Sequence, residues 1–228
     1  MSWFGFGGDA EPVAVDYEGL ACEKDDLQKV LDDKKAALQA ELDNDDGWTA
    51  VDLSGTPEFA GTTVETKQAG ELLSYRTRGY IPSASPEDML KLYWDPDLEA
   101  RKKWDTSLLS YKVLQKVNAN LEVVMSSYTA GVPLVANRVF VLLRGSEKRD
   151  GGVIHYAGMS INHAEAKQDP SDVRGVTAVF YRWTPHEGGT RVEQYLQADP
   201  KGSLPAMVVN AFKTKSAEQL VVFRKLFA

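Results

Sequence analysis

The spacing of apolar residues changes once along the chain, near residue 47. Before that point, leucines recur at intervals of seven and four residues, which places them on one side of a helix over about residues 17–43. These residues are Leu20, Leu27, Leu31, Leu38 and Leu42. From Trp48 onward apolar and polar residues alternate, as in strands with one buried face. We therefore predict an N-terminal helix whose leucines pack on a mainly β domain.

The alternating part predicts three strands, a helical region, about six further strands and a final helix. The predicted strands are residues 48–54, 62–68, 72–81, 108–117, 121–130, 136–145, 152–161, 175–184 and 190–198. Ser85 followed by Pro86 is typical of a helix start, because serine caps free backbone amides and proline fits the first turn. The helical region ends near Trp104. Antiparallel strands with helices at the ends of the chain indicate an α+β fold.

The final helix is predicted to begin near Ser203, after the stop at Asp199–Gly202. Its expected apolar stripe consists of Val208, Val209, Phe212, Phe223, Leu226 and Phe227. Lys213, Arg224 and Lys225 fall outside this stripe, and residues 203–228 hold four basic residues and one acidic residue, a net charge of +3. Such a basic face could approach an anionic membrane surface. A core helix with a solvated outer face has the same pattern.

Two predicted strands place polar side chains among apolar ones on the face that should be buried. On strand 190–198 this face consists of Val192, Gln194, Leu196 and Ala198. On strand 136–145 it consists of Ala136, Arg138, Phe140, Leu142 and Arg144. A buried polar group without a partner is costly. Either these groups lie at strand ends or pair with an acidic neighbour, or they line an interior cavity and orient a ligand.

Charge is distributed unevenly along the chain. Residues 1–46 carry 13 acidic and 4 basic residues, a net charge of −9, whereas residues 47–228 carry 20 acidic and 22 basic residues, a net charge of +2. Nothing in this distribution resembles the basic surface of a nucleic-acid-binding protein. Residues 1–16 are rich in glycine and contain Trp3, Phe4 and Phe6, which fits either a flexible terminus or a weak membrane anchor.

The candidate chemical groups are few. Cys22 is the single cysteine, which favours a reducing compartment and, with no apparent signal or membrane-spanning run, a cytoplasmic protein with at most peripheral membrane contact. His155 and His163 are eight residues apart with no further ligand at metal-binding spacing, and His186 lies in a predicted turn. We therefore expect no catalytic residue, no metal site and no cofactor.

Residues 94–145 resemble the START (StAR-related lipid-transfer) domain family. The shared motifs are Trp104–Asp105, the Pro-containing loop 130–136, and the strand Arg138–Val141, in which Val139 replaces the family's aspartate. "DPKGSLP" at 199–205 resembles the motif before the family's last helix, and "AGM" at 157–159 matches a family strand. The resemblance covers about residues 47–228, which leaves residues 1–46 as an acidic N-terminal segment.

This resemblance implies a helix-grip fold, in which a curved antiparallel sheet wraps around a long C-terminal helix with a lipid-sized cavity between them. It also implies that the protein binds one lipid and transfers or senses it. By position the family's buried basic residue falls on Arg144, and its acidic partner falls on Met125, which cannot pair with it. Arg144 would then be free to bind an anionic group, which favours a phospholipid over a sterol.

The candidate ligand-binding residues are Met125, Ser127, Arg138, Phe140, Leu142, Arg144, Tyr156, Tyr181, Gln194, Leu196, Val208 and Phe212. The candidate membrane-contacting gate consists of Val132, Pro133 and Leu134, in the loop Thr129–Ala136, together with Lys213. Two alternatives stay open: an enzyme of the wider helix-grip superfamily, such as a cyclase or hydrolase, and a lipid-regulated module whose helix 17–43 binds a protein partner. Deletion of residues 1–46 is expected to leave lipid transfer by a carrier intact.

Overall fold

The computed structural model describes residues 24–70, 72–202 and 206–228, without the side chains of residues 24–26 and 206–210. Residues 1–23, with Leu20 and Cys22, lie outside the described residues, as does Ser203. The helices are α1 (Lys24–Asp43), α2 (Pro86–Trp94), α3 (Leu98–Lys102) and α4 (Ala206–Leu226), with short 3₁₀ turns at Pro57–Phe59 and Asp150–Gly152. The strands are β1 (Thr49–Ala50), β2 (Thr63–Ala69), β3 (Leu72–Pro82), β4 (Leu108–Asn118), β5 (Leu121–Tyr128), β6 (Arg138–Lys148), β7 (Ile154–Ser160), β8 (Val173–Arg174), β9 (Val176–His186) and β10 (Gly189–Asp199).

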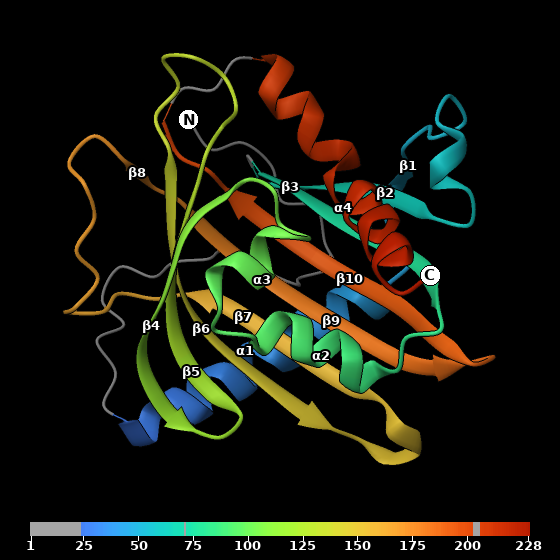
Figure 1. The fold of residues 1–228 in the computed structure, drawn as a ribbon, viewed down its shortest axis with the longest axis horizontal. Helices are drawn as coiled ribbons and strands as arrows, with labels where there is room; N and C mark the ends of the chain where they lie inside the picture. Colours follow the sequence, from blue (N-terminus) through green and yellow to red (C-terminus); the bar gives the residue numbers. More distant parts are fainter. Residues whose placement is uncertain (1–23, 71, 203–205) are drawn as a thin grey trace, which may run out of the picture.

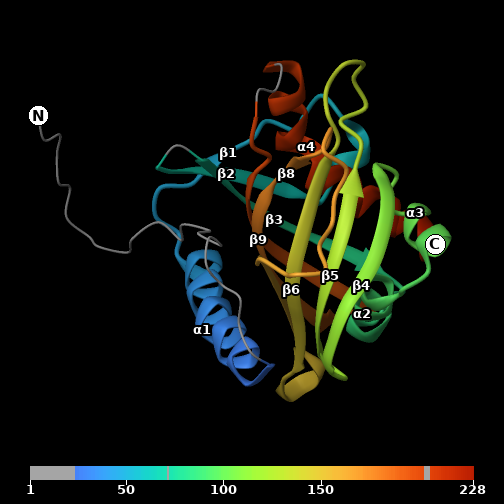
Figure 2. The same ribbon diagram turned by 90° about the vertical axis from the view of Figure 1, so that its left-hand side faces the viewer.

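The described strands form one sheet in the order β1-β2-β3-β10-β9-β7-β6-β5-β4, and β8 pairs with β6 off this path. Neighbours along the path are antiparallel, whereas β8 is parallel to β6. Helices α2, α3 and α4 cover one face of the sheet, and α1 lies on the opposite face (Figures 1 and 2). We call these the inward face and the outward face. The predicted α+β fold, with a large antiparallel sheet and a C-terminal helix, is confirmed.

Local sequence signals explain where several elements begin and end. Ser85 caps α2: its hydroxyl accepts a hydrogen bond from Asp88 N (3.1 Å), and the Asp88 carboxylate accepts one from Ser85 N (3.1 Å). The strand predicted over residues 48–54 is shortened to β1, because Asp52 Oδ1 accepts a hydrogen bond from Ser54 N (2.9 Å) and the chain turns there.

The leucines of α1 pack on the outward face of the sheet, as their spacing predicts. Leu27, Leu31, Leu38 and Leu42 are only 0–3% exposed and form one core with outward-facing residues such as Leu143. Ion pairs flank this contact, with Lys35 Nζ 2.7 Å from Glu147 and Arg182 Nη1 2.8 Å from Asp43. The apolar face of α1 is therefore covered by the protein's own sheet.

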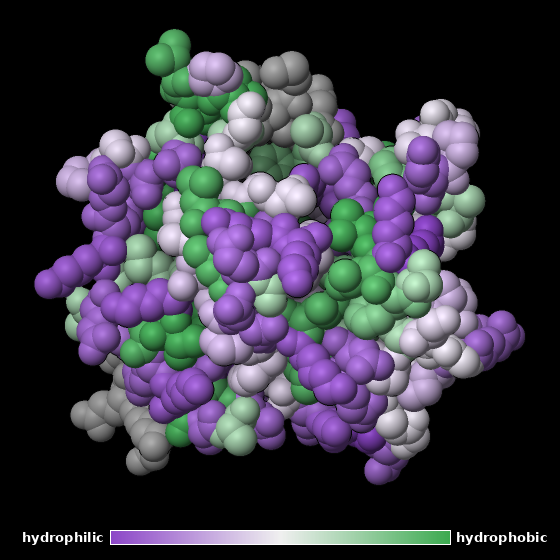
Figure 3. Space-filling view, in the orientation of Figure 1, coloured by the Kyte–Doolittle hydropathy of each residue, from purple (hydrophilic) through white to green (hydrophobic). Residues whose placement is uncertain are grey.

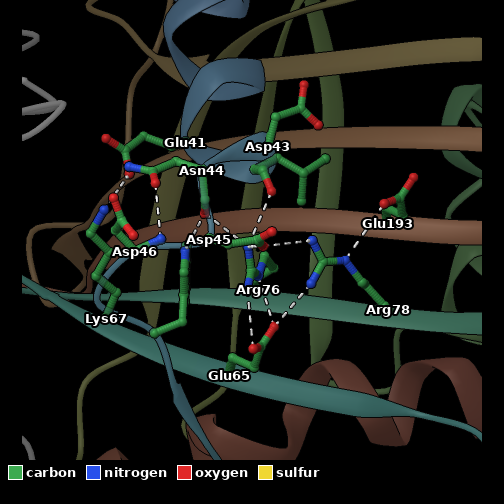
Figure 4. Close-up of polar contacts among 12 residues, drawn as sticks. Glu41, Asp43, Asn44, Asp45, Asp46, Glu65, Lys67, Arg76, Arg78 and Glu193 are labelled. Atoms are coloured by element: carbon green, nitrogen blue, oxygen red, sulfur yellow. Dashed lines mark hydrogen bonds and ion pairs between the residues drawn. The ribbon is translucent and has the colours of Figure 1, made fainter.

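Arg76, on β3, fixes the C-terminal end of α1 to the sheet (Figure 4). Its guanidinium donates hydrogen bonds to Asn44 O (2.9 Å), Asp45 Oδ1 (2.9 Å) and Glu65 Oε2 (2.8 Å). The last carbonyl groups of a helix lack partners within the helix, and a cation there also interacts favourably with the helix dipole. No local pattern predicts this role of Arg76, because the contact joins segments more than thirty residues apart.

The buried face of α4 differs from the predicted stripe. Phe212 and Leu226 are each 41% exposed, so their predicted burial is wrong; the side chains of Val208 and Val209 lie outside the described residues. The buried positions of the described part are Ser216, Ala217, Leu220 and Phe223. Gly79 of β3 sets this rotation, because a Cβ atom there would lie 2.6 Å from Leu220 Cδ1. The helix thus approaches the β3 backbone directly.

Candidate functional site

The inward face holds most of the residues that the sequence singled out for ligand binding. The inward-facing candidates are Arg138, Phe140, Leu142, Arg144, Tyr156, Tyr181, Gln194 and Leu196. Tyr156, Tyr181 and Leu196 pack with residues of α2 and α4 in one core. The predicted inward position of Gln194 is confirmed, and its Nε2 donates a hydrogen bond to Tyr181 Oη (2.6 Å).

Met125 and Ser127 do not lie on the inward face, so their predicted placement is wrong. Met125 pairs with Val141 and packs against the outward core that α1 covers, and Ser127 pairs with Val139. Side chains alternate along a strand, and a shift of one residue moves every side chain to the other face. In β5 the inward residues are Glu122, Val124, Ser126 and Tyr128.

Arg144 has an acidic partner, contrary to the prediction from Met125. It lies directly across the strand pair from Glu122, and its Nε and Nη2 are 2.9 and 2.5 Å from Glu122 Oε1. Arg144 also donates to the backbone carbonyl of Tyr93 and to the hydroxyl of Tyr111, and it stacks on the ring of Trp94 at 4.8 Å. Arg144 is only 1% exposed, and its guanidinium already has hydrogen-bond partners within the protein.

A further buried arginine, Arg101, was missed by sequence reasoning. It is 5% exposed, donates a hydrogen bond from Nη1 to Tyr93 O (2.8 Å), and stacks on Tyr111 at 4.2 Å. Its Nε is buried without a hydrogen-bond partner among the described residues. Burial raises the pKa of the nearby Asp105 carboxyl, and the charge of Arg101 opposes that rise. The four-residue spacing of Arg101 and Asp105 was the signal in the sequence.

Aromatic side chains fill the inward face under α2 and the C-terminal half of α4. Tyr93 is central, with ring centroids 5.0 Å from Trp104, 5.0 Å from Tyr181 and 5.2 Å from Trp183. Phe223 of α4 closes this cluster against Trp104 at 5.5 Å. Burial raises the pKa of the Tyr93 and Tyr181 hydroxyls well above their ordinary range. These hydroxyls therefore stay protonated and act as hydrogen-bond donors and acceptors.

Toward the other end of the sheet, inward-facing apolar residues are only half-buried. Phe140 and Leu142 of β6 and Leu196 of β10 keep part of their surface exposed although they face α4's side of the sheet. These three side chains therefore leave apolar surface on the inward face that is partly accessible to solvent.

The gate loop, Thr129–Ala136, and the first turns of α4 lie at the same end of the molecule (Figures 1 and 2). Leu134 is fully exposed and has a positive φ of 66°, a conformation that non-glycine residues seldom adopt. Pro133 is exposed and Val132 half-buried, and Figure 3 shows hydrophobic atoms projecting at this loop. Lys213 of α4 is half-buried.

Arg138, predicted to bind ligand, is engaged by the backbone. Its guanidinium donates to Ala136 O, to Pro200 O (3.1 Å) and to Lys201 O (3.1 Å). The first carbonyl belongs to the gate loop, and the other two belong to the turn between β10 and α4. Arg138 therefore joins two segments that are distant in sequence.

Residues 44–222 match the model of the START domain. The chain belongs to the START domain family. Membership implies lipid binding or transfer, without specifying the lipid class. A comparison with curated proteins found no match.

Solved structures share the fold of this START domain. The lipid transfer and protein localization domain of human StarD13 (DLC2) is 22% identical with a TM-score of 0.67, covering 85% of this chain and 95% of that one. Human StAR-related lipid transfer protein 5 is 21% identical with a TM-score of 0.69, covering 87% and 96%. Human STARD10 is 25% identical with a TM-score of 0.67, covering 85% and 80%.

Other kinds of site find no support in the part of the chain that the structure describes. No group of three or more His, Cys, Asp or Glu side chains there is arranged to hold a metal ion. His155 is buried on the outward face beside the ring of Phe180, and His163 Nε2 lies 3.0 Å from Gln115 Oε1. None of the described helices is long and apolar enough to span a bilayer.

Proposed function

We propose that this START domain binds one phospholipid between the inward face of the sheet and α4, and carries it through the cytoplasm between membrane surfaces. The observation that carries the proposal is the set of inward apolar side chains that the protein leaves half-buried, Phe140, Leu142 and Leu196. Each CH₂ group of an acyl chain placed against them contributes about 0.8 kcal/mol. An apolar surface of this kind can compete with a bilayer for the acyl chains of the lipid.

Arg101 is the better candidate for the phosphate group of such a lipid. Arg144 already bonds Glu122, Tyr93 O and the Tyr111 hydroxyl, whereas Arg101 has a buried Nε with no described acceptor. A phosphate oxygen would supply a charge-assisted hydrogen bond there. A sterol hydroxyl carries no charge to match the guanidinium, which is why the proposal favours a phospholipid.

The proposal is for a carrier without catalysis. Glu122 and Asp105 are the inward carboxyl groups near Arg101, and each faces a guanidinium: Glu122 is bonded to Arg144, and Asp105 interacts with Arg101. A general base needs a carboxylate within reach of the substrate proton. The Glu122 carboxylate, held in its ion pair with Arg144, serves the architecture of the interior and not proton transfer.

The direct test is native mass spectrometry of the full chain after incubation with mixed vesicles. The vesicles contain phosphatidylcholine, phosphatidylethanolamine, phosphatidylserine, phosphatidylinositol and cholesterol. One phospholipid per chain is expected. Recovery of cholesterol alone would contradict the phospholipid assignment, and recovery of no lipid would contradict the proposed function.

Arg101→Leu is expected to weaken phospholipid binding about ten-fold, the size of one lost charge-assisted hydrogen bond. Binding is measured as the protection of a fluorescent phosphatidylcholine from an aqueous quencher. Lys102→Leu is the matched control, because Lys102 follows in the same helix and pairs with Glu99 on the surface. If the Arg101→Leu variant and the wild type bind the lipid with equal affinity, Arg101 does not contact the lipid.

Leu134→Asn is expected to reduce binding to anionic vesicles about ten-fold or more, since burial of a leucine side chain contributes about 1.5–3 kcal/mol. Asparagine tolerates the positive φ of this position, so the fold is preserved. Co-sedimentation with phosphatidylserine vesicles measures the effect. Leu109→Asn is the control, because Leu109 is also exposed but lies on edge strand β4. An equal loss in both variants would contradict a specific role of the gate loop.

A further inference from the structure

Arg138 connects the base of the gate loop to the turn that follows β10. Its three described acceptors are carbonyl oxygens, one on Ala136 and two on Pro200 and Lys201. Arg138 is 7% exposed and forms no ion pair among the described residues. A guanidinium holds several donors in a rigid plane, so one side chain can fix the relative position of both segments.

The turn after β10 has the local structure of a defined corner. Lys201 and Gly202 have positive φ angles of 51° and 66°, and Lys201 N donates a hydrogen bond to Asp199 Oδ1 (2.8 Å). A Cβ atom at Gly202 would lie 3.6 Å from Arg138 Nη2, so the guanidinium lies directly against the corner. The position of this corner is therefore set by Arg138 as well as by its own backbone.

The C-terminal half of α4 is held by different contacts. Leu220 packs onto the backbone at Gly79, and Ser216 Oγ is 2.6 Å from Thr77 Oγ1. Arg224 donates hydrogen bonds to Tyr80 O (2.9 Å) and Ala60 O (3.0 Å). These contacts fix one end of α4 to β3 and its neighbours.

We propose that Arg138 is a positioning residue that makes the gate loop and the turn 199–202 move as one unit. Displacement of one segment alone would break its carbonyl contact to Arg138, so the two segments are displaced together. The consequence for lipid exchange rests on the proposed function: the inward face opens only when both segments move. The mechanical coupling itself depends only on the contacts of Arg138, so it can be measured without lipid.

The test is amide hydrogen exchange of the full, lipid-free chain, resolved to residues 129–136 and 199–202. Arg138→Gln is expected to speed exchange roughly ten-fold in both segments together, because each loses its contact to the guanidinium. Arg224→Gln is the matched control: it also removes an arginine bonded to backbone carbonyls, at the opposite end of α4. It is expected to speed exchange near Ala60 and Tyr80 and to leave both Arg138-linked segments unchanged.

Faster exchange in only one of the two segments, or in neither, would overturn the proposal. If Arg138→Gln does not fold, as judged by circular dichroism, Arg138→Lys repeats the test with the charge kept and the planar fork removed. A vesicle assay completes the experiment: loading and release of a fluorescent phosphatidylcholine should both accelerate several-fold, while the occupied fraction at equilibrium stays the same. If the segments loosen together but no lipid is carried, the proposed function is wrong and the role of Arg138 stands.

Discussion

Glu122→Leu is expected to lower the free energy of unfolding by about 3–5 kcal/mol, because it leaves Arg144 charged and buried without its partner. Glu122 and Arg144 are only 3% and 1% exposed, and Nη2 is 2.5 Å from Oε1. Water cannot replace the lost carboxylate. For a domain of this size the melting temperature should fall by roughly 6–20 °C. Urea denaturation followed by tryptophan fluorescence measures the change.

The double variant Glu122→Leu/Arg144→Met is expected to recover most of this loss, because apolar residues of similar volume often replace a buried pair at little cost. Glu99→Leu is the surface control: its pair with Lys102 is solvated and contributes at most about 1 kcal/mol. If Glu122→Leu alone is as stable as the wild type, the interior is open to water and Arg144 is free for a ligand after all.

The pattern of apolar residues predicted the elements well and the faces less well. The leucine seam of α1 follows from its helical period, and the strands β2 to β10, apart from short β8, follow from apolar or alternating runs bounded by turn residues. The family resemblance predicts Met125 at the position of the partner of Arg144, whereas the alternation of side chains along β5 places Met125 on the outward face. The acidic partner is Glu122, which lies directly across the strand pair from Arg144.

The long-range contacts could not be predicted in the same way. Helix α4 is apolar on several sides, and the side that packs inward is decided by the absence of a side chain at Gly79, on another element. Arg76 and Arg138 donate hydrogen bonds to backbone carbonyls of segments distant in sequence. A carbonyl group is present at every residue, so no sequence pattern marks which ones an arginine will reach.

Deletion of residues 1–46 is expected to leave a chain that does not fold at 25 °C, and not the intact carrier that the sequence suggested. The deletion removes Leu27, Leu31, Leu38 and Leu42, each 0–3% exposed against the outward face. Burial of a leucine contributes about 1.5–3 kcal/mol, so the four account for roughly 6–12 kcal/mol. Domains of this kind are stable by only about 5–15 kcal/mol in total. Circular dichroism and size-exclusion chromatography of the truncated chain measure the outcome.

Leu38→Ala tests the same packing without removing the helix. It is expected to lower the free energy of unfolding by about 2–5 kcal/mol, the usual range for a leucine that leaves a cavity in a core. Leu109→Ala makes the same chemical change at a position that is 43% exposed, and should alter stability by less than about 0.5 kcal/mol. A truncated chain that melts at the wild-type temperature would show that the outward face needs no cover. In that case the leucine seam of α1 would be free to bind a partner in place of its own sheet.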